Sequence, residues 1–205
     1  MSDFLIYSGY LILLINLIFY SFSFFRKKEV NVFFLGYLAF SCVMQYSMEI
    51  MYHLHTNNLF LSNIFIIGQL ILLGLFYNSL FTLKSQKSFV LISIGLALLI
   101  LGLQFMMDWS QFLRFNLFAI ALTSLLIVVY ALIHFYNMLT ESKTYYYASI
   151  GVVFYLLAST VLYFIGNLTH NLSNEFKFLS WQLNAFLIII YYFFILYEWK
   201  KSFSK

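Results

Sequence analysis

The chain has 205 residues, of which 63% are hydrophobic and only 9% are charged, and its mean hydropathy is +0.91. This composition excludes a soluble globular protein, because apolar stretches of about 20 residues, each able to cross roughly 30 Å of hydrocarbon, fill almost the whole length. The formal charge of +4 does not indicate nucleic-acid binding, since the basic residues lie in the short segments between those stretches.

The apolar stretches predict an all-α integral membrane protein, a seven-transmembrane-helix bundle forming one domain over residues 1–205. In lipid a continuous apolar run of this length is helical, because every backbone N–H and C=O must find a partner within the segment. The first run has no basic segment before it, so we expect it to be retained rather than cleaved as a signal peptide. In chain order the predicted spans are 4–25, 30–52, 59–83, 89–107, 112–138, 145–168 and 178–199.

Nine of the eleven basic residues fall on one side of the predicted bundle, and only Arg114 and Lys177 fall on the other. Because short cytoplasmic loops carry an excess of Lys and Arg, we expect the N-terminus outside and the C-terminus in the cytoplasm. The expected location is the cell (plasma or inner) membrane, with the lipid bilayer as the first partner. The nine residues are Arg26, Lys27, Lys28, Lys84, Lys87, Lys143, Lys200, Lys201 and Lys205.

Two stripes of polar residues run along predicted helices, where polar groups are costly and therefore informative. On the second span, Ser41, Gln45, Glu49 and His53 recur every four residues and so share one helix face. On the sixth span, a similar spacing of three or four joins the residues Tyr155, Ser159, Tyr163, Asn167 and His170.

The outer ends of these two stripes predict a ligand-binding site. Glu49 is the acidic residue that lies deepest within a predicted span, and His53 lies one turn away, so each is the nearest candidate partner of the other. We expect a small molecule or a lipid to bind in the outer half of the bundle. The predicted lining residues are Glu49, His53, Tyr163, Asn167 and His170. A purely structural hydrogen bond between helices is the alternative interpretation of Glu49.

Metal binding is an open alternative for the same region. His53, His55 and His170 lie on the predicted outer side, where Glu49 and Asp108 could complete a His/carboxylate site. No His-x-x-x-His or His-Glu-x-x-His element occurs, and the single cysteine, Cys42, excludes an intrachain disulfide and a cysteine-based metal motif. The identity of any metal or cofactor therefore stays unknown at this stage.

Seven helices with an outside N-terminus resemble the general plan of the heptahelical receptors, in topology alone, and topology does not assign function. Microbial rhodopsins carry a retinal-linking Lys in the seventh helix. No Lys occurs between Lys177 and Lys200 here, which counts strongly against a retinal protein. The chain has no proline, unlike PQ-loop carriers, and it lacks the His-x-x-x-His element of hydrolases similar to the adiponectin receptors and alkaline ceramidases.

The leading hypothesis is a non-enzymatic, receptor-like or sensor-type membrane module that signals through a protein partner or a homo-oligomer. Three alternatives remain open: a structural or assembly subunit of a larger membrane complex, a metal-dependent membrane lipid hydrolase, and a small transporter or channel. The absence of proline counts against a transporter, because broken transporter helices commonly use Gly or Pro at the break.

Overall fold

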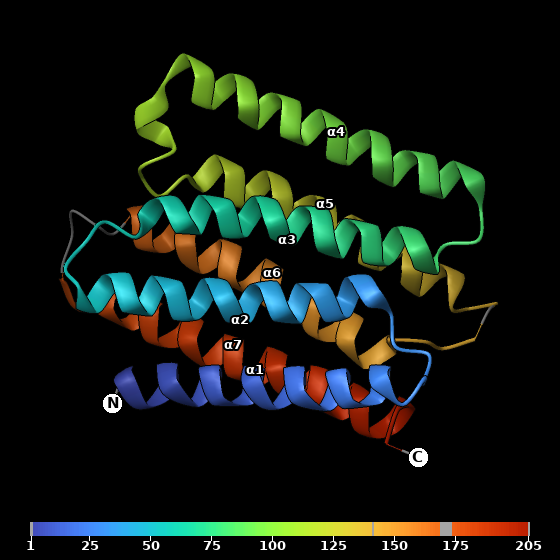
Figure 1. Ribbon diagram of the computed structural model, residues 1–205. Helices are drawn as coiled ribbons and strands as arrows, with labels where there is room; N and C mark the ends of the chain where they lie inside the picture. The colour runs from blue at the N-terminus through green and yellow to red at the C-terminus, as the bar shows by residue number, and fades with distance from the viewer. Residues whose placement is uncertain (1, 141, 169–173, 205) are drawn as a thin grey trace. The chain divides into compact units, whose positions relative to one another are not determined.

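A computed structural model describes residues 2–140, 142–168 and 174–204 (Figure 1). These residues form α-helices and one short 3-10 helix, and they contain no β-strand, which confirms the all-α prediction. The helices are α1 (Ser2–Phe25), α2 (Val32–His53), α3 (Leu59–Leu80), α4 (Lys84–Met107), η1 (Trp109–Gln111), α5 (Leu117–Asn137), α6 (Tyr146–Leu168) and α7 (Asn174–Ser202).

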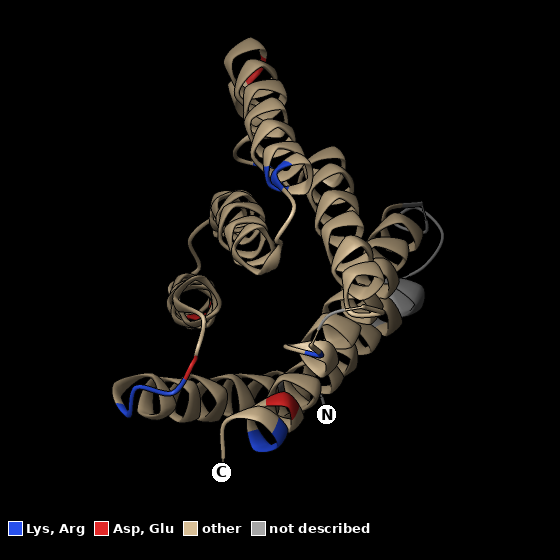
Figure 2. Cartoon of the chain, turned by 90° about the vertical axis from the view of Figure 1, so that its right-hand side faces the viewer, with Lys and Arg blue, Asp and Glu red and all other residues tan. Residues whose placement is uncertain are grey.

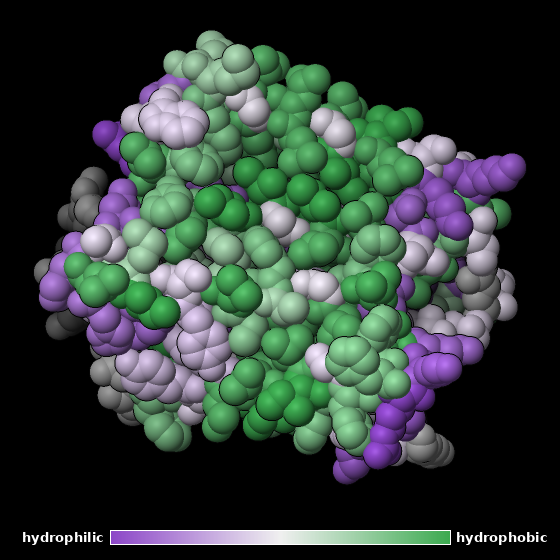
Figure 3. All heavy atoms as spheres, in the orientation of Figure 1, coloured by the Kyte–Doolittle hydropathy of each residue, from purple (hydrophilic) through white to green (hydrophobic). Residues whose placement is uncertain are grey.

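Within the described part of the chain, six of the seven α-helices are long and apolar enough to cross a membrane. The exception is α2, whose apolar character is interrupted by Gln45, Glu49 and His53. On the face drawn in Figure 3, hydrophobic side chains cover the middle of the helices and hydrophilic ones gather toward the helix ends. The chain is therefore a multi-pass helical membrane protein.

Two helix starts lie five residues from the predicted ones because hydropathy does not register polar turns and caps. The helix α4 begins at Lys84 instead of residue 89, since its first turn is polar, and there Gln86 exchanges two hydrogen bonds with Asn137 at 3.0 and 2.8 Å. The helix α5 begins at Leu117 instead of residue 112, because the Asn116 side chain accepts a hydrogen bond from Ala119 N and caps it.

The helices form two compact units, and the first comprises residues 1–30 and 141–205. Its central helix is α7, which packs against both α1 and α6. The Asn16 amide of α1 donates to Tyr192 O at 2.9 Å, and Tyr20 OH donates to Ile195 O at 3.2 Å. Helix α6 approaches α7 closely at Gly151, where an added Cβ would lie 2.8 Å from Phe194 Cβ.

The second unit comprises residues 31–140, and its central helix is α3, which packs against α2, α4 and α5. Hydrogen bonds between side chains join its helices: Ser93 to Tyr130 at 2.7 Å between α4 and α5, and Gln69 to Tyr37 at 3.5 Å between α3 and α2. Buried amides and hydroxyls of this kind hold helices together where no hydrophobic effect acts between them.

Candidate functional site

The polar face of α2 passes from buried to exposed along its length. Ser41 is fully buried and Gln45 is nearly so, whereas the Glu49 side chain is 21% exposed and the His53 side chain is 61% exposed. The four residues lie one turn apart, so one continuous face carries this gradient. The accessible polar groups of α2 are therefore confined to its C-terminal end.

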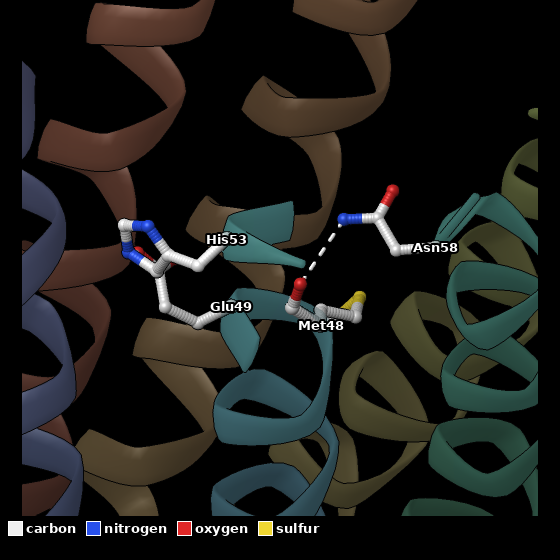
Figure 4. A network of polar contacts seen from close by, with 4 residues as sticks. All are labelled: Met48, Glu49, His53 and Asn58. Atoms are coloured by element: carbon white, nitrogen blue, oxygen red, sulfur yellow. Dashed lines mark hydrogen bonds and ion pairs between the residues drawn. The ribbon is translucent and has the colours of Figure 1, made fainter. Parts of the chain in front are cut away.

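At that end, Glu49 and His53 form a hydrogen-bonded pair, as the spacing predicts. Glu49 Oε1 lies 3.1 Å from His53 Nε2, and the two side chains lie side by side in Figure 4. The pair combines a hydrogen-bond acceptor with an imidazole that can donate or accept. A ligand with an amine, a hydroxyl or an acidic group could replace either partner.

The end of α2 that carries the pair is held by well-defined caps. His55 has a positive φ of 53°, and the amide of Thr56 donates to Met51 O at 3.0 Å, which is the pattern of a Schellman cap. The Asn58 amide donates to Met48 O at 3.1 Å (Figure 4). His55 thus terminates the helix, and the backbone beneath the Glu49–His53 pair is fixed.

The other predicted ligand residues belong to the first unit. Tyr163 of α6 accepts a hydrogen bond from the Asn184 amide of α7 at 3.0 Å, and Asn167 is exposed near the end of α6. His170 lies outside the described residues. The structure therefore brings Glu49 to His53 and Tyr163 to Asn184, while one pocket lined by all five predicted residues stays a prediction.

No three His, Cys, Asp or Glu side chains of the described residues come close enough together to hold a metal ion. Asp108, a candidate ligand by sequence, interacts with its own loop instead. Its carboxylate accepts hydrogen bonds from Ser110 N at 3.0 Å and Gln111 Nε2 at 3.2 Å. Together with the charge of Arg114, these bonds to Ser110 and Gln111 lower the pKa of Asp108 and keep it ionised.

A buried carboxylate that the polar stripes did not indicate is Glu198 of α7, which is 1% exposed. Its Oε2 accepts hydrogen bonds from Tyr147 N at 2.7 Å and Ala148 N at 3.4 Å, and its Oε1 accepts one from Ser202 Oγ at 2.6 Å. The residue preceding α6 is Tyr145, which has no short side-chain oxygen to cap the helix. Glu198 therefore caps α6 from another helix.

A sequence signal for this residue existed but was ambiguous. Glu198 stands next to Trp199 at the end of the last span, just before Lys200 and Lys201, and a single carboxylate beside two lysines is most simply interpreted as a solvated interfacial group. Asn16, in the middle of the first span, and Asn63, near the start of the third, were stronger signals, because an amide within hydrocarbon needs a partner.

No model of a known protein family matches the chain, and neither the curated proteins nor the solved structures include a match to it.

Proposed function

We propose that the chain is a receptor-like, multi-pass membrane module that senses a small molecule or a lipid through the outer end of α2. The Glu49–His53 pair recognises the ligand, and Tyr163, Asn167 and His170 are the further residues proposed to line the site. The response passes to a protein partner or to a second copy of the chain.

One observation supports this proposal above the others: Glu49 and His53 remain accessible at the end of α2, whereas the other carboxylate within a predicted span, Glu198, and the amides Asn16 and Asn63 are buried in structural contacts. Asn16 and Glu198 are fully buried and bind backbone groups of neighbouring helices. A hydrogen-bonded Glu–His pair that leaves three fifths of the imidazole side chain exposed at a helix end is accessible to a ligand. Polar residues within a membrane-spanning helix are functional candidates because placing them in hydrocarbon costs free energy.

The proposal includes seven crossings, with the N-terminus outside. Helix α2 has 22 residues, and at 1.5 Å per residue it is about 33 Å long, enough to cross the hydrocarbon despite its polar end. The distribution of basic residues then places the ends of α1 and α7 in the cytoplasm and His53 outside.

Cysteine labelling tests this orientation. In a Cys42→Ser background, a membrane-impermeant maleimide applied to intact cells should modify His55→Cys and leave Lys27→Cys unmodified until the membrane is permeabilised. Residues 27 and 55 are both exposed, whereas Cys42 is buried. The side of the membrane on which each introduced cysteine lies therefore decides whether the reagent modifies it. The reverse pattern would invert the proposed orientation, and labelling of both or neither would show that α2 does not cross.

Removing the charged pair tests the ligand site. The chain is purified from its native membrane, and its bound small molecules and lipids are compared by mass spectrometry for wild type and the double variant Glu49→Gln, His53→Gln. A molecule enriched with the wild type should fall about tenfold in the variant, because the loss of one charged hydrogen bond corresponds to about 1.5–3 kcal/mol.

The matched control is Glu29→Gln, which removes an exposed carboxylate on the predicted cytoplasmic side and should leave the bound molecules unchanged. Identical extracts from wild type and double variant would contradict a ligand role for the pair. A protein partner that copurifies at fixed stoichiometry with both would instead favour an assembly subunit.

A further inference from the structure

One end of the first unit carries a basic rim, which we define as Arg26, Lys27, Lys143, Lys200 and Lys201. All five side chains are exposed, and they come from three separate parts of the sequence: the end of α1, the segment before α6 and the end of α7. Figure 2 shows the basic end of α7 in blue beside the C-terminus.

Contacts beneath the rim hold α1 and α7 together at this end. Trp199 Nε1 donates to Ser23 Oγ at 2.9 Å, and the Trp199 ring stacks on Phe19 with centroids 4.3 Å apart. The ammonium of Lys28 donates to Phe203 O. These contacts hold the ends of α1 and α7 at the same end of the unit, so the basic residues that follow α1 and those at the end of α7 share that end.

The start of α6 is held at the same end of the unit. Glu198 binds the first turn of α6 through Tyr147 N and Ala148 N, and the Phe203 ring contacts Tyr145 with centroids 5.5 Å apart. Lys143, two residues before Tyr145, therefore joins the rim. The fold thus brings basic residues from three separate parts of the sequence to one end of the unit.

Little negative charge balances the rim within the described residues of this end. Glu198 is buried and bound to backbone amides, which leaves Glu29 as the exposed carboxylate. Two of the cations lie over aromatic rings, with Arg26 3.9 Å from the Phe22 centroid and Lys143 5.8 Å from the Tyr146 centroid. A ring positions a cation without neutralising its charge.

We infer that the basic rim binds the phosphate groups of anionic lipid headgroups. The apolar helices α1, α6 and α7 place the rim at the level of a membrane surface, where Lys and Arg are attracted to anionic lipid. Two parallel N–H groups of Arg26 can bind one phosphate, while each lysine attracts headgroup phosphates as a point charge.

The binding stabilises the fold, because five like charges held at one end repel each other until an anion neutralises them. A ligand that binds the folded state and not the unfolded state raises the melting temperature. Lipid binding by the rim does not depend on the Glu49–His53 pair or on which side of the membrane that pair faces. Either proposal can therefore be wrong while the other is right.

The test measures thermal unfolding of the full chain in nanodiscs of phosphatidylcholine alone or mixed with phosphatidylglycerol. The anionic lipid should raise the melting temperature by about 5 °C at low salt, and high salt should remove the gain because exposed charges are screened. The double variant Lys200→Gln, Lys201→Gln should lose about two fifths of the gain, because it removes two of the five rim charges, and Lys200→Arg, Lys201→Arg should keep it.

The matched control is Lys84→Gln, Lys87→Gln, which removes two basic groups at the start of α4 in the other unit and should keep the gain. Equal melting temperatures in the two lipid mixtures would overturn the inference. An equal loss in both lysine pairs would overturn it as well, since the attraction would then depend on total charge rather than on the rim.

Discussion

Replacing Glu198 with alanine should lower the free energy of unfolding by about 3 kcal/mol, because two buried backbone donors of α6 and the Ser202 hydroxyl lose a charged acceptor. The carboxylate also lies at the positive end of the α6 dipole, which adds to the loss. Unfolding in mixed micelles with increasing SDS measures the difference.

Two further variants separate the contributions of Glu198. Glu198→Gln retains one acceptor oxygen and loses the charge, so it should cost only about 1 kcal/mol. Glu29→Ala removes an exposed carboxylate from the same end of the unit and should change stability by less than about 0.5 kcal/mol. A Glu198→Ala variant as stable as Glu29→Ala would show that Tyr147 and Ala148 do not depend on this cap.

The second large effect is expected at Asn63, whose side chain organises the segment between α4 and α5. Asn63 is 1% exposed, and its amide lies 2.7 Å from Phe112 O, 2.8 Å from Arg114 O and 3.4 Å from Gln111 O. Leucine branches at Cγ as asparagine does, but it has no N–H group to donate to these carbonyls. Asn63→Leu should therefore cost about 2 kcal/mol.

Hydrogen exchange of the amides in residues 108–116 measures this effect locally and should become roughly tenfold faster or more in the Asn63→Leu variant. The control is Asn57→Ala, which removes two exposed hydrogen bonds, one of 3.3 Å to Leu113 O in the same segment and one of 3.0 Å from Leu59 N, and should cost less than about 1 kcal/mol. Equal exchange in the two variants would contradict an organising role for Asn63.

The loop that Asn63 holds rests on a small apolar core formed by Leu101, Phe105 and Ala119. Phe112, within the loop, packs edge-on against Phe105 with centroids 5.3 Å apart. Burial of this ring explains why residue 112 belongs to the predicted apolar run although the helix begins only at Leu117. A hydropathy pattern records burial, and the cap at Asn116 decides where the helix starts.

The paired residues of α2 could be predicted because their contact is local. Glu49 and His53 are four positions apart, and any α-helix places such residues on adjacent turns. The spans were predictable for a similar reason, since length and apolar character decide whether a segment is helical in lipid. Six of the described helices meet that criterion, and α2 departs from it at the polar residues that mark the candidate site.

The contacts that hold each unit together could not be predicted in this way. Asn16 and the Tyr192 carbonyl are 176 positions apart, and Glu198 and Tyr147 are 51 apart. A span shows that an internal amide or carboxylate needs a partner, but its sequence does not say which helix provides one. Tyr163 illustrates the consequence, because its role by sequence was a ligand contact and the structure gives it Asn184 as a partner.

The all-helical, multi-pass character of the protein and the pairing of Glu49 with His53 follow from the amino-acid sequence, because both depend on chemistry within a few turns of one helix. The division into two units, the capping of α6 by Glu198 and the position of distant cations at one end of the first unit emerge only in three dimensions. These features depend on which helices pack together, and close approaches such as that at Gly151 fix that choice through the fit of side chains across helices.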